Sequence, residues 1–278
     1  MNVLSIQSDV VYGHVGNAAA RFALQRLGHE VWAVPTVLLS SHAGYAEVGG
    51  ESLSADLLRR VIDGLDANGW LGSCDAILSG YLGQADHASV VANAVRRVKA
   101  ANRHAVYCLD PVFGDAGRAY AKPGVAEAMA RELLPLADIV TPNVFELSSL
   151  TSVAIRDAND ALVAAQRLGR PIVLVTSVPA GDDRIGTLAV SKDEVWLAST
   201  PLLANPPHGS GDLMAALFLA HHLAGFSLKE SLAKTAASVF AILEKSVTAG
   251  SHEMLLIQLQ DALVAPPENA ALRIQSIT

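Results

Sequence analysis

Short apolar runs alternate with longer helical patterns from one end of this sequence to the other. Helical spacing is clear in Val91, Val95 and Val98, and again between residues 232 and 243. Strand and helix in alternation predict a mostly parallel sheet with helices on both of its faces. The expected strands are Val3–Ile6, Val31–Val37, Ala76–Ser79, Ala105–Leu109, Ile139–Val140, Ile172–Val175, Gly186–Val190 and Val195–Ser199.

The composition agrees with this α/β architecture. Hydrophobic residues make up 51% of the 278 residues and aromatic residues only 5%, so the core must consist mainly of Ala, Val and Leu. Such small side chains suit parallel strands that are covered by helices on both faces. No Pro/Gly-rich linker divides the chain. We therefore expect one domain over residues 1–265, followed by a loosely attached tail over residues 266–278.

The charge and the hydropathy pattern exclude several classes of partner. The net charge is −7, which argues against binding to nucleic acid or to a membrane surface. A phosphate site in such a chain would rely on backbone N–H groups and a divalent cation. The N-terminus lacks the charged and apolar regions of a signal peptide, and the apolar runs are shorter than the ~20 residues that span a bilayer. We expect a cytoplasmic protein.

Polar residues follow five of the expected strands. Ligands in open α/β sheets bind beyond the carboxyl ends of the strands, where these residues would converge. Each pair taken alone is also a plausible start of a loop, but five together predict a site. They are Gln7-Ser8, Gly80-Tyr81, Asp110-Pro111, Thr141-Pro142 and Thr176-Ser177.

The run GSGD at residues 209–212 precedes a strongly apolar helical pattern. The glycines Gly209 and Gly211, on either side of Ser210, allow backbone N–H groups to converge, and a helix N-terminus binds anions. Asp212 would then be a base beside a cradle for developing negative charge. The alternative is an acidic residue in the first helical turn that only stabilises the helix.

A second set of polar residues is suited to a metal ion. The carboxylates of Asp110 and Glu146, together with Thr141, offer the oxygen ligands that Mg²⁺ prefers, with nucleotide phosphates and water completing the shell. Asp110 precedes a proline and is equally compatible with an Asx-type turn. Glu146 lies three residues after Asn143, which is the spacing of a capping box. Capping and metal binding do not exclude one another.

Seven motifs in the same order resemble those of pyridoxal kinases, members of the ribokinase-like fold. The resemblance extends from about residue 3 to about residue 245, and the motifs together are far more specific than any one of them. They are SIQSDVVYGHVGN at 5–17, PTVLLS at 35–40, SGY at 79–81, DPVFGD at 110–115, TPNVFEL at 141–147, VTS at 175–177 and GSGD at 209–212.

The resemblance implies ATP-dependent phosphorylation of the 5′-hydroxymethyl group of pyridoxal, pyridoxine or pyridoxamine, in vitamin B6 salvage. It implies a homodimer that uses Mg²⁺ and a monovalent cation, K⁺ or Na⁺. Asp212 matches the catalytic base, and Gly209, Ser210 and Gly211 match the anion hole. The vitamin-side matches are Ser8, Val15, Ala43, Gly44 and Tyr81. The nucleotide- and metal-side matches are Asp110, Asp115, Tyr120, Thr141, Glu146, Thr176 and Ser177, of which Asp110, Tyr120 and Glu146 match metal-side positions.

Four residues depart from the family pattern: Asp9 and Ala43 near the vitamin site, Ser210 in place of the usual Thr or Val, and Ser148 in place of a second Glu. Asp9 stands where the family more often has His or Gln, and Ala43 replaces a frequent hydroxyl residue. The Ala43 change removes one hydrogen bond to the substrate and bears on affinity more than on the reaction. Two alternatives therefore stay open: a hydroxymethylpyrimidine kinase with the same anion hole, and a non-catalytic protein that binds pyridoxal phosphate or a nucleotide. A Rossmann dehydrogenase is disfavoured, since no GxGxxG follows the first strand.

Overall fold

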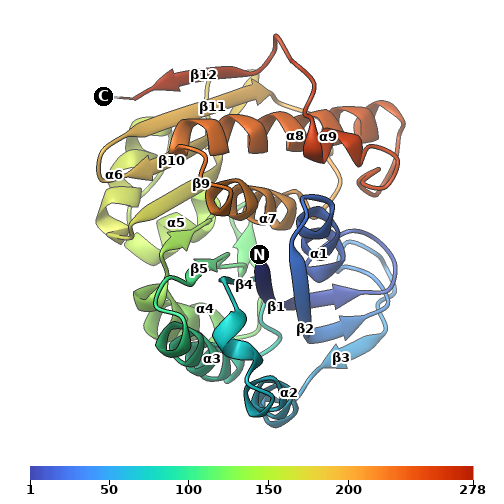
Figure 1. Ribbon diagram of the computed structural model, residues 1–278. Helices are drawn as coiled ribbons and strands as arrows, with labels where there is room; N and C mark the ends of the chain where they lie inside the picture. Colours follow the sequence, from blue (N-terminus) through green and yellow to red (C-terminus); the bar gives the residue numbers. More distant parts are fainter. Residues whose placement is uncertain (278) are drawn as a thin grey trace.

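A single ten-stranded sheet forms the centre of the molecule, in a computed structural model that describes residues 1–277 (Figure 1). Its strand order is β12-β11-β10-β9-β8-β5-β4-β1-β2-β3. The strands are β1 (Asn2–Val10), β2 (Glu30–Leu39), β3 (Gly50–Ser52), β4 (Ala76–Ser79), β5 (Val106–Leu109), β8 (Ile139–Val140), β9 (Ile172–Pro179), β10 (Arg184–Ser191), β11 (Val195–Pro201) and β12 (Arg273–Ser276). A separate hairpin consists of β6 (Gly114–Asp115) and β7 (Arg118–Ala119).

The helices connect and cover these strands. They are α1 (Asn17–Arg26), α2 (Ala55–Ala67), α3 (His87–Ala101), α4 (Val125–Ala128), α5 (Val144–Thr151), α6 (Ala158–Leu168), α7 (Ser210–Leu223), α8 (Leu228–Thr248) and α9 (Asp261–Val264). Short helical turns of other types occupy Trp70–Ser73, Met129–Leu133 and Leu134–Leu136. Within residues 1–277, none of the helices combines the length and the apolar character that crossing a bilayer requires.

The prediction of a mostly parallel sheet is confirmed. From β2 to β9 along the sheet all neighbours are parallel, and antiparallel strands occur only at the two ends. All eight expected strands are present, and β1 and β9 extend well beyond their expected ends. The strands that sequence analysis missed are β3, β6, β7 and β12, which are two to four residues long.

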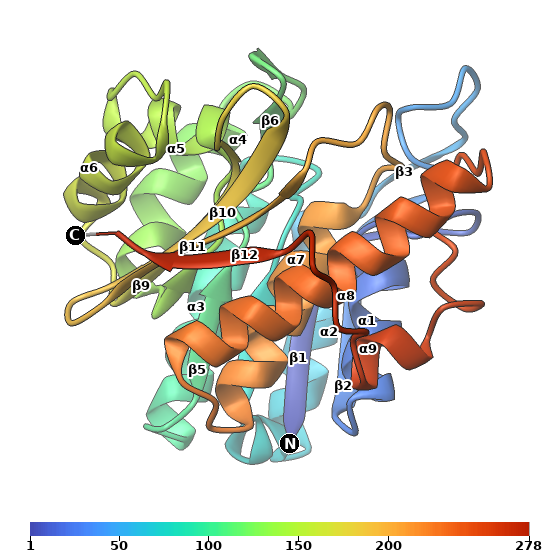
Figure 2. The same cartoon turned by 90° about the horizontal axis from the view of Figure 1, so that it is seen from above.

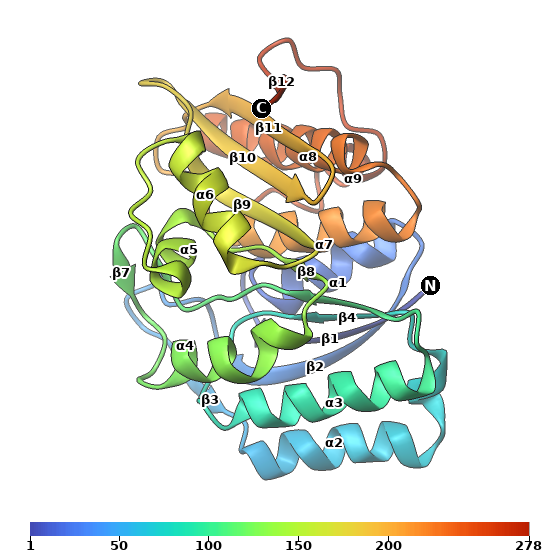
Figure 3. The same cartoon turned by 90° about the vertical axis from the view of Figure 1, so that its left-hand side faces the viewer.

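Two faces of the sheet carry different helices, as Figures 1 and 3 show. Val3 and Ala76 pack with α1, α7 and α8, whereas Leu4 and Ile77 pack with α2, α3 and α4. This division follows from the two-residue period of a strand, which turns successive side chains to opposite faces. Helices α5 and α6 cover β9 and β10 through a third cluster that includes Val173.

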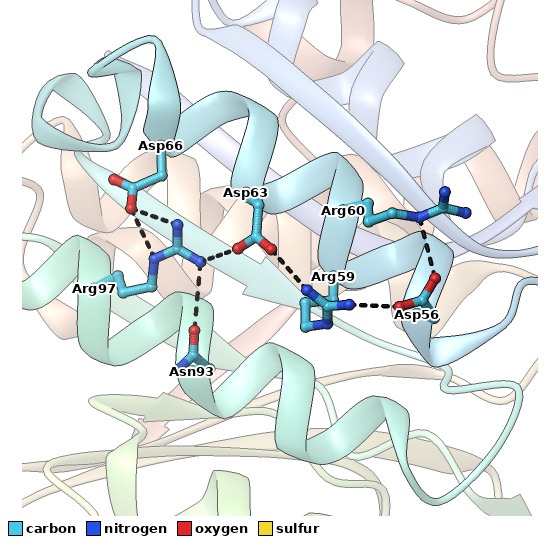
Figure 4. A network of polar contacts seen from close by, with 7 residues as sticks. All are labelled: Asp56, Arg59, Arg60, Asp63, Asp66, Asn93 and Arg97. Carbon is cyan, nitrogen blue, oxygen red and sulfur yellow. Dashed lines mark hydrogen bonds and ion pairs between the residues drawn. The ribbon is translucent and has the colours of Figure 1, made fainter.

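Helices α2 and α3 are joined by a polar network (Figure 4). The guanidinium of Arg97 on α3 donates to Asp63 at 2.7 Å and also contacts Asp66, both on α2. Arg59 donates to the other oxygen of Asp63 at 3.1 Å. These hydrogen bonds to Arg97 hold the pKa of the Asp63 carboxyl below its usual value. The network fixes how α2 lies on α3, at a partly exposed surface.

The C-terminal segment differs from the expectation of a loosely attached tail. Arg273–Ser276 form β12, which pairs antiparallel with β11 and lies along it in Figure 2. Leu272 and Ile274 pack against the core cluster of α7 and α8, so this segment gains both backbone hydrogen bonds and apolar burial. Residue 278, the last of the expected tail, lies outside the described residues.

Candidate active site

A cavity of about 690 Å³ opens at the carboxyl ends of the parallel strands and reaches the start of α7. It is lined by the predicted nucleotide-side, metal-side and anion-hole residues, but not by the predicted vitamin-side residues. Asp110 directly follows β5, Thr141 directly follows β8, and Thr176 and Ser177 lie on β9. The predicted residues that line it are Asp110, Asp115, Tyr120, Thr141, Glu146, Thr176, Ser177, Gly209, Ser210, Gly211 and Asp212.

The start of α7 forms a backbone cradle at one wall of this cavity. Gly209 caps the helix with φ +93°, and a Cβ atom added there would overlap the backbone oxygen of His14. Only glycine satisfies both requirements. A Cβ atom on Gly211 would meet no heavy atom within 4 Å. Because first-turn N–H groups have no acceptor within the helix itself, those of Ser210 and Gly211 are suited to an anion that enters the cavity.

Asp212 lies in this first turn and lines the same cavity. Burial raises the pKa of its carboxyl to about 6, although a backbone hydrogen bond from Gly16 works in the opposite direction. A carboxylate with this pKa is ionised near neutral pH and is more basic than an exposed Asp. Both the pKa of Asp212 and its position in the cavity therefore suit a general base.

Asp110 and Glu146 are both buried and face the cavity. The Thr141 hydroxyl donates to Asp110 Oδ1 at 2.8 Å. This hydrogen bond links the residue that follows β5 to the residue that follows β8. Glu146 completes a capping box with Asn143 and also accepts hydrogen bonds from the N–H groups of Phe113 and Gly114. The capping interpretation of Glu146 is thus confirmed, and the same carboxylate also lines the cavity.

The charges around the cavity are predominantly negative. Among the described residues that line it, four are acidic, none is Lys or Arg, and burial lowers the pKa of the one histidine, His208. Burial and the Asp212 charge raise the pKa of Asp110 to about 8, and burial together with Asp110 raises that of Glu146 well above its usual range. Two buried carboxylates side by side, with an adjacent hydroxyl, are a donor set that fits Mg²⁺.

The β6–β7 hairpin borders the cavity on the same side as these carboxylates. Asp115 lies on β6, and Tyr120 follows β7, where its N–H donates to the Phe113 carbonyl at 3.0 Å. Burial and the surrounding carboxylates raise the pKa of the Tyr120 phenol, which is therefore neutral. The ring centroid of Tyr120 lies 6.5 Å from that of Tyr81.

The five predicted vitamin-side residues do not line this cavity, but Tyr81 and Gly44 lie beside residues that do. Tyr81 approaches the cavity through Tyr120. Gly44 lies against the ring of His208, where an added Cβ atom would come within 2.8 Å of Nε2. Gly16 packs on Ser8, and Val15 precedes that glycine. Ala43 is exposed in the loop between β2 and β3.

Sequence analysis left the apolar end of the cavity unassigned. Leu202, Met214, Val239 and Phe240 line it, on the segment after β11 and on α7 and α8. The periodic apolar positions of residues 232–243 were recognised as a helix. That pattern alone does not distinguish a side chain in the core from one that lines a cavity, because both are apolar.

The chain is similar to kinases in sequence and in structure. Residues 56–256 match a family described as phosphomethylpyrimidine kinase. A pyridoxal kinase PdxY from Rubrobacter xylanophilus is 48% identical over 281 residues, which cover 98% of this chain and 97% of the relative. One from Corynebacterium diphtheriae is 46% identical, with 96% of both chains covered.

Two solved structures show the same similarity over the whole fold. A pyridoxal kinase from Leishmania donovani in complex with ADP and pyridoxamine aligns with a TM-score of 0.94 and 31% identity, covering 100% of this chain and 99% of that chain. A pyridoxal kinase from Entamoeba histolytica aligns with a TM-score of 0.90 and 29% identity, covering 99% of each chain.

Proposed function

This chain belongs to the pyridoxal kinase family, and we propose that it transfers the terminal phosphoryl group of ATP to the 5′-hydroxymethyl group of pyridoxal. Pyridoxine and pyridoxamine are substrates of the same type. The observation that carries this proposal is the position of Asp212 beside the Gly209–Gly211 cradle, in a cavity of about 690 Å³ that also has an apolar end. The need for ATP supports a cytoplasmic location.

Asp212 accepts the proton of the substrate hydroxyl while the oxygen forms its bond to phosphorus and ADP leaves. Positioning and charge stabilisation dominate such a transfer, because its transition state is loose. The N–H groups of Ser210 and Gly211 donate to the oxygens of the group in transfer. A carboxylate in this role contributes typically ~10²–10⁴-fold to the rate.

The cluster of acidic side chains, with no Lys or Arg among the described residues that line the cavity, is the reason to include a cation in the proposal. Asp110 and Glu146 would hold Mg²⁺, which supplies positive charge to the nucleotide phosphates. Thr141 orients Asp110 through its hydrogen bond, and Thr176 and Ser177 lie on the phosphate side. A monovalent cation, K⁺ or Na⁺, and a homodimeric assembly stay predictions from the family resemblance.

The two ends of the ligand region are assigned by their chemistry. Leu202, Met214 and Phe240 provide apolar surface for the adenine base. On the other side, the vitamin ring would lie among Ser8, Val15, Ala43, Gly44 and Tyr81, as the family resemblance implies. The small Ala43 leaves one polar group of the substrate without a hydroxyl partner at this position.

The test is an ADP-release assay on the purified protein with MgATP and a panel of acceptors. Pyridoxal, pyridoxine and pyridoxamine should release ADP, and mass spectrometry should show a 5′-phosphate on the vitamer. Hydroxymethylpyrimidine belongs in the panel because the matching family is described as a phosphomethylpyrimidine kinase. Release with the pyrimidine and with none of the B6 vitamers would assign the chain to that related activity instead.

A further inference from the structure

One carboxylate outside the cavity bonds two distant loops at once. Glu253 lies between α8 and α9, and its side chain is 12% exposed. Its Oε2 accepts a hydrogen bond from the N–H of His14 at 3.0 Å. Its Oε1 accepts from the Tyr45 hydroxyl at 2.8 Å and lies 3.0 Å from Nε2 of His42. The loops that it joins are residues 11–16, after β1, and residues 41–49, between β2 and β3.

The hydrogen bonds of His42 indicate which tautomer its ring adopts. The N–H of Gly44 donates to Nδ1 at 3.1 Å, so this nitrogen carries no proton and the neutral ring has its proton on Nε2. Nε2 then donates to Glu253. Through His42, the carboxylate therefore reaches the backbone of Gly44, one of the predicted vitamin-side residues. The hydrogen bond to Glu253 also raises the pKa of Tyr45 to about 12.

The first loop is shaped around the same carboxylate. Gly13 adopts φ +98°, and a Cβ atom added to it would lie 2.7 Å from Oε2 of Glu253. Glycine is favoured there by the backbone conformation, and a side chain at this position would displace the Glu253 carboxylate. The segment that carries Glu253 is itself fixed, since Ser251 Oγ donates to the Glu253 carbonyl at 2.7 Å and accepts from its N–H at 3.2 Å.

The contact continues to the anion cradle. The backbone oxygen of His14, whose N–H is bonded to Glu253, occupies the space that a Cβ atom on Gly209 would need. The methyl group of Met254 lies 2.9 Å from the same point. Val15, another predicted vitamin-side residue, follows His14 directly. The loop residues that bond to Glu253 are therefore adjacent in the sequence to the loop residues that the substrate would contact.

We infer that Glu253 is a positioning residue that holds loops 11–16 and 41–49 in register with each other and with the Gly209 cradle, so that the acceptor alcohol meets Asp212. The inference rests on the proposed function for the identity of the acceptor. The loop geometry itself is independent of that identity. Glu253 touches no reacting atom, and its effect passes through His14, His42 and Tyr45.

The kinetic test uses Glu253→Ala in the full-length enzyme. The KM for pyridoxal should rise roughly tenfold or more, because the variant loses three hydrogen bonds to the Glu253 carboxylate in the loops that would bind pyridoxal. The KM for MgATP should stay within about twofold, because the nucleotide end of the cavity is formed by other segments. A parallel rise of both constants, or a pyridoxal KM within about twofold of wild type, would overturn the inference.

Two variants separate positioning from general destabilisation. Glu253→Gln keeps the length of the side chain and one oxygen acceptor, so its pyridoxal KM should lie between those of the wild type and Glu253→Ala. Glu268→Ala removes an exposed carboxylate from the same end of the chain and should match the wild type. A Gln variant as impaired as the Ala variant would contradict a role in loop geometry.

Hydrogen exchange gives a readout that does not require any activity. In Glu253→Ala, or in the Gln variant should the Ala variant not fold, amides of residues 11–16 and 41–49 should exchange faster than in wild type. Those of the β6–β7 hairpin should not change. Unchanged exchange in both loops would overturn the inference even in an active enzyme. Absence of ADP release by the wild type with every B6 vitamer would instead refute the proposed function and leave the exchange result interpretable.

Discussion

Replacing Asp212 by Asn tests the central part of the proposed mechanism. The amide retains the size of the carboxylate and can still accept the hydrogen bond from Gly16, but it cannot take up a proton near neutral pH. General-base catalysis of this kind is worth typically ~10²–10⁴-fold, so kcat should fall by about that factor. The KM for MgATP should change little, since the apolar end of the cavity is untouched.

The pH dependence provides an independent check on the same residue. With a pKa of about 6, Asp212 is ionised to about nine tenths near pH 7 and to about one tenth near pH 5. At saturating substrates, the wild-type kcat should therefore drop roughly tenfold between these values. In Asp212→Asn this limb of the profile should disappear. Both enzymes can be measured by coupled ADP release between about pH 5 and about pH 8.

The matched control is Asp193→Asn, which removes one exposed carboxylate from the turn between β10 and β11. It should reproduce both the rate and the pH profile of the wild type. Near-normal turnover of Asp212→Asn, or a residual limb near pH 6 in that variant, would remove Asp212 from the role of base. A loss of MgATP binding in the same variant would show that the carboxylate acts on the nucleotide and not on the alcohol.

Four further predictions concern the cradle, the metal side, the helix pair and the assembly. Gly209→Ala should abolish most activity and lower Tm, because the added Cβ atom would overlap the backbone oxygen of His14. Gly225→Ala is the control: Gly225 also has a positive φ of +83°, but an added Cβ atom would meet no heavy atom within 4 Å. It therefore measures the cost of the backbone conformation alone. Asp110 keeps its proton in the folded state up to about pH 8, above its unfolded pKa of 3.8, so this group destabilises the fold increasingly as pH rises through that window. Asp110→Asn should therefore raise Tm at about pH 8 and leave it unchanged below about pH 4. The same variant should lower kcat. A gain in Tm that is largest in acid would contradict the reasoning. Arg97→Ala should lose roughly 0.2–1 kcal/mol of unfolding free energy, less at high salt, with kcat unchanged, as measured by denaturant titration. Light scattering after gel filtration should give twice the chain mass of 29.0 kDa, and a mass equal to one chain would refute the homodimer.

The fold was predictable because it is encoded in short-range periodicity. The run Ala76–Leu78 is apolar at every position, which is the pattern of a strand buried on both faces. The hairpin β6–β7 and the strand β3 lack this pattern, since they are short; β3 lies at an edge of the sheet and β6–β7 lies outside it. β12 was missed for a different reason: the prolines before it indicate a tail, and its pairing with β11 depends on the packing of Ile274 on a distant helix.

The candidate site likewise has one part that the sequence predicts and one part that it does not. Asp110 and Thr141 could be placed together from the sequence, because the topology of a parallel sheet brings its strand ends to one edge. Asp212 was predicted separately, from the glycines that precede a helix and from the family resemblance. Glu253 belongs to no motif, and its partners His14, His42 and Tyr45 lie more than 200 residues away in the sequence. Backbone topology therefore makes the chemistry of this site predictable from the sequence. The loops that would present the substrate are held by side-chain contacts between distant segments, and only the folded structure reveals those contacts.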